Sequence, residues 1–283
     1  MRRRGSPLSP AIVVALVLAG CTVTDSILTD ALEERPAWRD AEARACMMRI
    51  GTTPPVGMTQ IAKIGGPGGC GIEAPLQISA FAGGAVAVGP TATLGCPLGE
   101  AVDDWLKQSV QPAAVAYFGV AVVGIRQLSN YACRRPMGWR PGQLSEHSYG
   151  NALDVAEFKL ADGRLVTVEK GWRGASDEQA FLREIAVTGC QRFRTFLGPG
   201  VAFHHNHFHV DLAHRGESGA DRYCRPLPNV KVPPERAPTG GIWAVADPNR
   251  RGRLLTDMPD DVAKEIQDPF GVTKAKPEAE ASQ

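Results

Sequence analysis

The histidines of this chain are concentrated in two short stretches. Of the six histidines, five lie between His204 and His214, in a segment that begins HHNHFHVD, and the sixth is His147, in the segment SEHSYGNALD. Each quoted segment ends in an aspartate, Asp154 in the earlier one and Asp211 in the later one. Imidazole and carboxylate groups bind zinc, and imidazole also transfers protons near neutral pH. The two segments are therefore the candidate chemical centre of the chain.

The later segment is predicted to form a strand, in which side chains alternate between two faces. The odd-numbered residues from 203 to 211 would share one face, and the even-numbered residues from 202 to 212 the other. Phe208, Val210 and Leu212 suit a core, which leaves His207 and His209 side by side on the opposite face. Two imidazoles at this spacing suit a zinc site, where neutral nitrogen donors bind at roughly 2.0–2.1 Å.

The earlier segment adds a carboxylate ligand. Its turn contains Gly150, which is free to take a positive φ, and an alternating stretch, ALDVAEF, follows. This pattern predicts a strand in which Asp154 and Phe158 share a face. His147, Asp154 and one histidine of the later pair would give zinc three protein ligands. The fourth position would be left to water, which is the open arrangement that catalytic zinc sites need.

These motifs resemble those of a superfamily of zinc metallopeptidases. The pattern S-x-H-x-x-G-x-A-x-D, followed by H-x-H, is similar to the signatures of lysostaphin-type enzymes, D-Ala-D-Ala peptidases and the hedgehog signalling domain. Within that superfamily, YACR, LSEHSYGNALDVAEF and HFHVDLA resemble the bacterial extensin-like protein C-terminal family, over roughly residues 46–224. The resemblance implies hydrolysis of an amide bond in peptidoglycan stem peptides or cross-links, with Zn²⁺ as the cofactor.

The resemblance also implies roles for individual residues. It makes His147, Asp154 and His209 the zinc ligands. It places His207 where the lysostaphin-like branches keep a histidine that helps to activate water or to stabilise the oxyanion. These four residues form the core of the expected catalytic site.

Further residues are expected to bind substrate or to orient the site. Arg134, at the end of SNYACR, is similar to a substrate-binding arginine of the D-Ala-D-Ala branch and would clamp a carboxylate. Ser145, which opens the main motif, is also assigned to substrate binding. Asp211 or His205 is expected to orient a ligand imidazole, and the sequence leaves open which of them does so.

One position departs from the pattern of the resembling enzymes. In the D-Ala-D-Ala branch a glutamate three residues before the last histidine ligand is the general base, but here that position is Asn206, which cannot take a proton. We expect His207 or Glu146 to take this catalytic role. The alternative is a non-catalytic, zinc-stabilised module that attaches the envelope to peptidoglycan without cutting it.

Simpler roles are also open for several of these residues. His147 and Asp154 would also suit a buried hydrogen-bonded pair beside a turn, and Glu146 would suit a solvated surface charge. The remaining histidines are expected at the surface or behind the ligands. They are His204, His205 and His214.

The first residues are typical of an export signal. A basic start is followed by an apolar run from Ala11 to Leu18, which is too short to span a bilayer. The next residues, up to Cys21, resemble the lipobox of bacterial lipoproteins. This resemblance predicts a signal peptide over residues 1–20 and a lipidated Cys21, which would anchor the protein at the periplasmic face of the outer membrane. An ordinary cleaved signal or an uncleaved anchor is the alternative.

The composition indicates one ordinary core and no polyelectrolyte character. The 283 residues are 43% hydrophobic and carry a net charge of +1, without a basic stripe, so nucleic acid is not expected as a partner. The expected partners are peptidoglycan peptides and, through the lipid anchor, a membrane. After the signal peptide we expect a tether over residues 21–40, a zinc metallopeptidase-like domain over 41–230, and a Pro-rich, largely disordered tail over 231–283.

The other cysteines predict disulfides. Six remain after Cys21: Cys46, Cys70, Cys96, Cys133, Cys190 and Cys224. An even number of cysteines in an exported domain favours three bridges, and their pairing stays open because six cysteines allow 15 combinations. A cysteine zinc site is less expected, because the chain has no C-x-x-C pair.

Hydrophobic periodicity predicts the elements that must position the site. It favours a helix over residues 99–117, bent or ended near Pro112, and a buried strand over 119–125. A second helix is predicted to begin at a capping box formed by Ser176 and Gln179, and to close at Gly198. The residues before the first helix are expected to be rich in loops. The resulting fold class is α+β: a small antiparallel sheet that carries one zinc site, flanked by helices and stabilised by disulfides.

Overall fold

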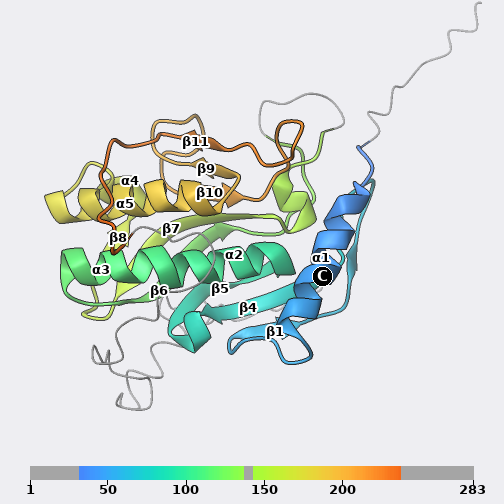
Figure 1. Cartoon of the computed structure of the whole chain (residues 1–283), viewed down its shortest axis with the longest axis horizontal. Coiled ribbons are helices and arrows are strands. Elements are labelled where there is room, and N and C mark those ends of the chain that lie inside the picture. Colours follow the sequence, from blue (N-terminus) through green and yellow to red (C-terminus); the bar gives the residue numbers. More distant parts are fainter. Residues whose placement is uncertain (1–31, 137–142, 237–283) are drawn as a thin grey trace, which may run out of the picture. The chain divides into compact units, whose positions relative to one another are not determined.

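The computed structural model describes residues 32–136 and 143–236 of the chain (Figure 1). Among these residues, no helix has the length and apolar character needed to cross a membrane. The predicted signal peptide, Cys21 and most of the predicted tail lie outside the described residues. The predictions for these segments therefore stay predictions.

The described residues form helices, short helical turns and strands. In order they are α1 (Ala37–Ile50), β1 (Met58–Gln60), β2 (Ile64–Gly65), β3 (Gly71–Ile72), β4 (Pro75–Phe81), η1 (Ala82–Gly84), β5 (Val86–Gly95), α2 (Cys96–Trp105), η2 (Leu106–Val110), α3 (Gln111–Phe118), β6 (Val122–Ser129), η3 (Glu146–Tyr149), β7 (Ala152–Leu160), β8 (Leu165–Thr167), α4 (Val168–Gly171), α5 (Ser176–Arg192), β9 (Thr195–Leu197), β10 (Phe208–Asp211) and β11 (Tyr223–Arg225).

The main sheet is large and mixed, so the prediction of a small antiparallel sheet was wrong. The described residues contribute nine strands to it, in the order β1-β4-β5-β6-β7-β10-β9-β11, with β8 beside β7. Most neighbours are antiparallel, but β5 pairs with β6, and β9 with β11, in parallel. The error arose before the first predicted helix, where β1, β4 and β5 occupy residues that were expected to be mostly loops.

A layer of helices covers one face of the sheet. Figure 1 shows α2, α3 and α5 lying across this face. Trp105 of α2 is fully buried there, and its ring centroid lies 5.7–6.1 Å from those of Phe158, Phe193 and Phe196. Its indole N–H donates to the carbonyl of Ile185 in α5 at 3.1 Å, so the one polar atom of the buried Trp105 side chain has a hydrogen-bond partner.

The predicted helices are present with different boundaries. The run over 99–117 consists of α2, the π-helical turn η2 and α3, and Pro112 lies in the first turn of α3 rather than ending the helix. The strand predicted over 119–125 is β6, which starts and ends later. The capping box was wrong, because Ser176 is already helical and the Gln179 side chain donates to the carbonyl of Gly174 at 2.9 Å.

Three disulfides cross-link the domain, as the cysteine count predicted. Cys46–Cys96 joins α1 to α2, Cys70–Cys133 joins the β2–β3 hairpin to the segment after β6, and Cys190–Cys224 joins α5 to β11. Their sequence separations are 50, 63 and 34 residues. Loops of this size predict that each bridge destabilises the unfolded chain by about 4 kcal/mol.

Contacts of the domain reach beyond residues 41–230 at both ends. Glu33, in the predicted tether, accepts a hydrogen bond from the Tyr149 hydroxyl at 2.5 Å. Arg236, in the predicted tail, donates two hydrogen bonds of 2.8 and 2.9 Å to the buried carboxylate of Glu184 in α5. A two-point contact of this kind fixes the direction of the arginine side chain.

Candidate metal site

Two strands and one turn bring His147, Asp154 and His209 together. One potential ligand atom from each residue lies within 4.8 Å of the other two. Asp154 of β7 is directly opposite His209 of β10 in the antiparallel register, and His147 lies in the 3₁₀ turn η3, just before β7. His147 and Asp154 are buried, and His209 is largely buried. The ligand set predicted from the motif is thus assembled in one place.

Local chemistry explains why the η3 turn forms. Ser145 precedes the turn, and its hydroxyl accepts a hydrogen bond from the His147 amide at 3.4 Å. Gly150 ends the turn with a φ of 63°, as the sequence predicted, and a Cβ there would lie 2.3 Å from the Ile72 side chain. A glycine is therefore required at this position by both conformation and space.

A bulge in β7 changes which face of the sheet its side chains take. Between Val155 and Glu157, β7 has one extra residue relative to β6. The extra residue reverses the alternation of side chains, so Phe158 is fully buried in the helix-side core while Asp154 faces the opposite side of the sheet. The prediction that Asp154 and Phe158 share a face was wrong for this reason.

The ring of His147 is oriented by the backbone. Its Nδ1 lies 2.7 Å from the carbonyl oxygen of Asn130, so this nitrogen carries the proton and donates it. The lone pair of Nε2 is then directed toward Asp154, whose Oδ2 lies 3.4 Å away. A metal-binding histidine typically has its second nitrogen held in this way.

His209 lies between two carboxylates. Its Nδ1 is 2.8 Å from Asp154 Oδ1, and its Nε2 is 3.0 Å from Asp211 Oδ2. Asp211 is itself held by the Ala213 amide at 2.9 Å. Of the two residues proposed to orient a ligand imidazole, Asp211 is therefore the one in place for His209. An imidazole held at Nε2 presents Nδ1 to the cluster.

The charges of this cluster shift the pKa values of His209 and Asp154. Burial alone would lower the pKa of His209, but the hydrogen bonds to Asp154 and Asp211 outweigh it, and the pKa rises from 6.5 to about 10. Burial alone would raise the pKa of Asp154, but its interactions with the neighbouring His147 and His209 imidazoles hold that pKa well below its usual range. Without a metal, the site therefore contains an imidazolium between carboxylates.

His207 lies beside this cluster but outside regular structure. The strand predicted over residues 202–212 exists only as β10, which begins at Phe208. His207 Nε2 is nevertheless 3.7 Å from Asp154 Oδ1, and its Nδ1 donates to Asn206 Oδ1 at 2.8 Å. Burial lowers the pKa of His207 to about 4, so its imidazole is neutral near pH 7.

His204 is a neighbour of the site that the strand pattern missed. Alternation placed it on the face opposite His207, but the rings of the two histidines are 5.2 Å apart, and those of His204 and His209 are 5.7 Å apart. The reason is the irregular path of residues 203–207, where Phe203 has a φ of 66°. A strand period carries no information about side chains on such a loop.

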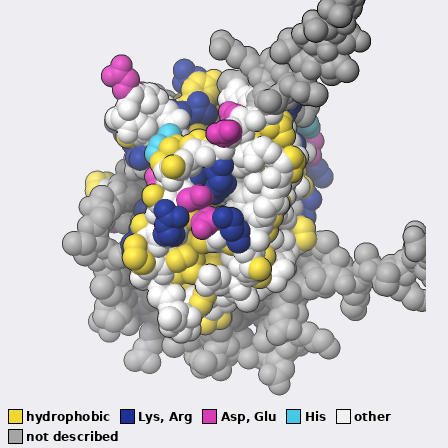
Figure 2. Space-filling view, turned by 90° about the vertical axis from the view of Figure 1, so that its right-hand side faces the viewer, with side chains coloured by type: hydrophobic (Ala, Val, Ile, Leu, Met, Phe, Trp, Pro, Cys, Tyr) yellow, Lys and Arg dark blue, Asp and Glu magenta, His cyan; other side chains and the backbone are white. Residues whose placement is uncertain are grey.

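Glu146, the first residue of the η3 turn, is held by two partners. Its carboxylate accepts two hydrogen bonds from Arg39 of α1, at 2.7 and 2.8 Å, and one from Asn151 at 2.6 Å. Figure 2 shows basic and acidic side chains interleaved on the α1 side of the molecule. These contacts occupy the oxygens that a general base would need free. No local pattern in the sequence indicates the pairing with Arg39.

The other predicted residues have different surroundings. The Ser145 hydroxyl is directed at the His147 amide, and the backbone of Arg134 bonds to Ser145 and Ser148. His214 stacks on Trp38 with ring centroids 3.4 Å apart, outside the ligand cluster. His205 is likewise not a member of the cluster among the described residues.

The donor set could hold a metal ion. Each imidazole of the cluster has one nitrogen bonded to a fixed acceptor and the other directed at Asp154, so loss of the Nδ1 proton of His209 is enough to present two nitrogens and one carboxylate. Two imidazoles and one carboxylate are typical ligands of zinc. The chemistry of the residues therefore fits such an ion.

Comparison with known proteins gives one match. Residues 44–225 match the family model described as extensin-like protein C-terminus. No curated protein and no solved structure matches the chain. The matched range contains all three residues of the cluster and the six cysteines of the disulfides.

Proposed function

The chain belongs to the extensin-like protein C-terminal family, and from that membership we propose that it is a zinc-dependent peptidase related to the lysostaphin and D-Ala-D-Ala superfamily. Its substrate would be an amide bond in peptidoglycan stem peptides or cross-links. The observation that carries the proposal is the buried His147–Asp154–His209 cluster with a neutral histidine, His207, directly beside it.

The proposed cofactor is one Zn²⁺, held by His147, Asp154 and His209. When bound, it would supply Lewis acidity toward water and toward the scissile carbonyl. Support comes from the fixed outer partners of the two imidazoles, the carbonyl of Asn130 and the carboxylate of Asp211. Such partners orient a ligand and raise its basicity toward a metal.

His207 would transfer the proton of the reaction. Its Nδ1–H is donated to Asn206, so the Nε2 lone pair, on the side of Asp154, is available to accept a proton from the attacking water. The same nitrogen would then deliver that proton to the leaving amine. Asn206 stands where the D-Ala-D-Ala branch has its glutamate base, and its role here would be to orient His207. Glu146 does not compete for the role, since Arg39 and Asn151 occupy its oxygens.

Binding of the substrate would involve a carboxylate of the stem peptide. Of the two residues predicted for this task, we retain Arg134, whose guanidinium suits a carboxylate. Ser145 uses its hydroxyl to accept from the His147 amide, which is a role in building the turn.

The proposed location is the periplasmic face of the outer membrane, through a lipid on Cys21. The lipobox-like residues before Cys21 support this proposal, together with the three disulfides of the domain, which need an oxidising compartment. Wild-type protein should partition with membranes, and Cys21→Ser should release it or stall its processing. A wild-type protein found freely soluble in the periplasm would contradict the anchor.

One experiment tests the enzymatic function. Purified protein is analysed for bound metal and incubated with muropeptides, with and without a chelator, and the products are separated by mass. We expect about one zinc per chain and cleavage that the chelator abolishes. His207→Ala should retain zinc while turnover falls by roughly 10²–10⁴-fold, the usual cost of a lost acid–base group. Zinc binding without any cleavage by the wild type would favour the non-catalytic peptidoglycan-binding module, which Asn206 keeps as the second candidate.

A further inference from the structure

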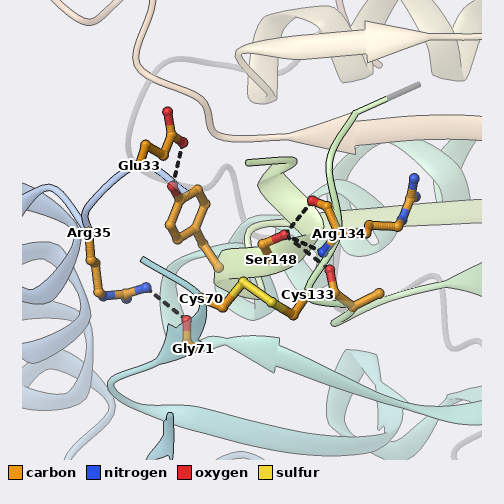
Figure 3. Close-up of a disulfide and its surroundings, with 9 residues drawn as sticks. Glu33, Arg35, Cys70, Gly71, Cys133, Arg134 and Ser148 are labelled. Atoms are coloured by element: carbon orange, nitrogen blue, oxygen red, sulfur yellow. Dashed lines mark hydrogen bonds between the residues drawn. A yellow bond between two sulfur atoms is a disulfide. The ribbon is translucent and has the colours of Figure 1, made fainter. Parts of the chain in front are cut away.

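The segment after β6 wraps around the turn that carries His147. This segment, Asn130–Arg134, contains Cys133, and it runs beside His147 and Ser148 of η3. Figure 3 shows Ser148 joined by hydrogen bonds to this segment, next to the Cys70–Cys133 disulfide. A proposed metal ligand, its neighbour and a disulfide cysteine are therefore parts of one small network.

The network contacts His147 on two sides. The carbonyl of Asn130 accepts from the His147 ring at 2.7 Å, and the amide of Ala132 donates to the His147 carbonyl at 3.1 Å. The Asn130 side chain accepts from the amides of Thr93 and Tyr131, at 3.2 and 2.9 Å, which holds this end of the segment against β5.

Ser148 closes the network on the other side. Its hydroxyl is fully buried and lies 3.1 Å from the carbonyl oxygen of Ala132 and 2.8 Å from that of Arg134, and it donates to one of them at a time. The Ser148 hydroxyl oxygen also accepts a hydrogen bond from the Arg134 amide at 2.9 Å. Ser148 therefore bonds to the backbone on both sides of Cys133.

The disulfide ties this segment to a second support. Cys70 lies in the β2–β3 hairpin and is buried in a small cluster with Leu144 and with Tyr149, the last residue of η3. The hairpin is held in turn by Arg35, which donates to the carbonyl of Gly71 at 2.7 Å. The disulfide thus connects the segment covalently to the hairpin whose Cys70 packs against Tyr149 of the η3 turn.

We propose that the Cys70–Cys133 disulfide is a positioning element of the metal site, which keeps the Asn130 carbonyl in place as the acceptor of the His147 ring. The inference rests on the proposed zinc site and assigns the disulfide a role in metal affinity beyond its contribution to stability. Without the bridge, the segment after β6 can move away from η3, and the His147 ring loses the partner that fixes its tautomer and direction. Loss of such a partner typically lowers metal affinity by about 10–100-fold.

A second disulfide provides the matched control. Cys46–Cys96 closes a loop of similar length, 50 residues against 63, and joins α1 to α2. Neither of its cysteines bonds to His147, Asp154, His209 or the segment after β6 among the contacts of the described residues. Removing it should destabilise the fold to a similar extent, because the entropic effect of a bridge depends on loop length.

The experiment compares zinc affinity and stability in the full-length protein. Zn²⁺ dissociation constants are measured by competition with a chromophoric chelator for the wild type, Cys70→Ser/Cys133→Ser and Cys46→Ser/Cys96→Ser. We expect a loss of about 10–100-fold only in the first double variant, with both variants melting at lower temperatures. The absorption spectrum of the Co²⁺-loaded protein should change in the first variant and not in the second. Equal zinc affinity in all three proteins would overturn the inference, whereas a wild type that binds no zinc would overturn the proposed function itself.

A second pair of variants keeps the test decisive if the first double variant does not fold. Ser148→Ala removes the hydroxyl that bonds to the backbone around Cys133 and leaves the disulfide intact, and Ser109→Ala, at a buried serine in η2, is its control. Ser148→Ala should weaken zinc binding and alter the Co²⁺ spectrum, while Ser109→Ala should do neither. Unchanged zinc affinity in Ser148→Ala would contradict the role of this segment.

Discussion

The ligand cluster and the adjoining histidine loop, residues 203–207, are built in opposite ways. In the cluster, each imidazole bonds to a group from a separate part of the chain, His147 to Asn130 and His209 to Asp154, and His209 bonds in addition to Asp211, two residues away. In the histidine loop, each of two imidazoles bonds at Nδ1 to a group at most two residues away: His204 to the carbonyl of Ala202, and His207 to the Asn206 side chain.

This difference separates two kinds of task. A metal site needs ligands that are fixed relative to one another, which neighbouring strands provide through their register. A group that accepts and returns a proton needs a defined tautomer and some freedom to follow the substrate, which a locally bonded loop residue has. Under the proposed function, the contrast fits metal binding by the strands and the η3 turn, and proton transfer by the loop.

The largest expected effect is the loss of a ligand from the cluster. Asp154→Ala removes the carboxylate that faces both ligand histidines, so zinc affinity should fall by more than the roughly 10–100-fold seen when an outer partner is lost. His207→Ala, the matched change in the histidine loop, should leave zinc bound. Metal analysis after dialysis checks both. If His207→Ala loses zinc and His209→Ala keeps it, the division of tasks between strands and loop is wrong.

The second prediction concerns the pH dependence of the metal-free protein. The pKa of His209 is raised from 6.5 to about 10 in the fold, so the stability that its protonated form contributes is complete below pH 6.5 and is lost as the pH rises through 10. Chelator-treated protein should therefore become less stable to denaturant between neutral pH and about pH 10. His209→Gln should show a weaker dependence than His214→Gln, whose histidine lies outside the cluster. A flat profile for the wild type would contradict the proposed charge of His209.

The third prediction concerns the tautomer of His207. Asn206→Ala removes the acceptor of its Nδ1–H, and turnover should fall by roughly 2–10-fold, because one neutral hydrogen bond is worth about 0.5–1.5 kcal/mol. Asn206→Asp keeps an acceptor oxygen at this position and should recover most of the activity. The rates are compared at saturating substrate, with zinc content measured in parallel. Equal turnover in the alanine variant and the wild type would show that Asn206 does not orient the base.

Part of the cluster was predictable from a local relation, while the choice of His209, 55 positions after Asp154, came from the resemblance to known metallopeptidases. His147 and Asp154 lie within one ten-residue motif, and the short period of β10 places His209 and Asp211 on one face. The three disulfides followed from the cysteine count. Their pairing did not, because it depends on which distant elements pack together.

The parts that sequence reasoning missed depend on tertiary structure or on broken periodicity. The contact between Arg39 and Glu146 joins residues 107 positions apart, and no local pattern announces it. The bulge in β7 and the irregular path before β10 both violate the alternation that was assumed, which misplaced Phe158 and His204. The size of the sheet was underestimated for a different reason. The stretch PLQISAF of β4 does alternate, with Leu76 and Ile78 buried, so this strand could have been recognised from the sequence.

The smallest expected effect concerns backbone strain in the histidine loop. Phe203 has a φ of 66° although it is not a glycine, and its side chain is 61% exposed. The left-handed conformation costs a residue with a Cβ roughly 1–2 kcal/mol, and glycine avoids this cost but loses about 0.5–1 kcal/mol through the entropy of the unfolded chain. Phe203→Gly should therefore stabilise the fold by about 0.5–1 kcal/mol, which raises the melting temperature by roughly 2 °C.

Ala82, which lies away from the histidine cluster, provides a control for the strain at Phe203. Ala82, after β4, has a φ of 55°, so Ala82→Gly should relieve strain in the same way without touching the histidines. If the strain in the histidine loop serves the site, Phe203→Gly should lower turnover while raising stability, whereas Ala82→Gly should raise stability alone. A Phe203→Gly variant with higher stability and unchanged turnover would show that the strained backbone does not contribute to the placement of His204 and His207.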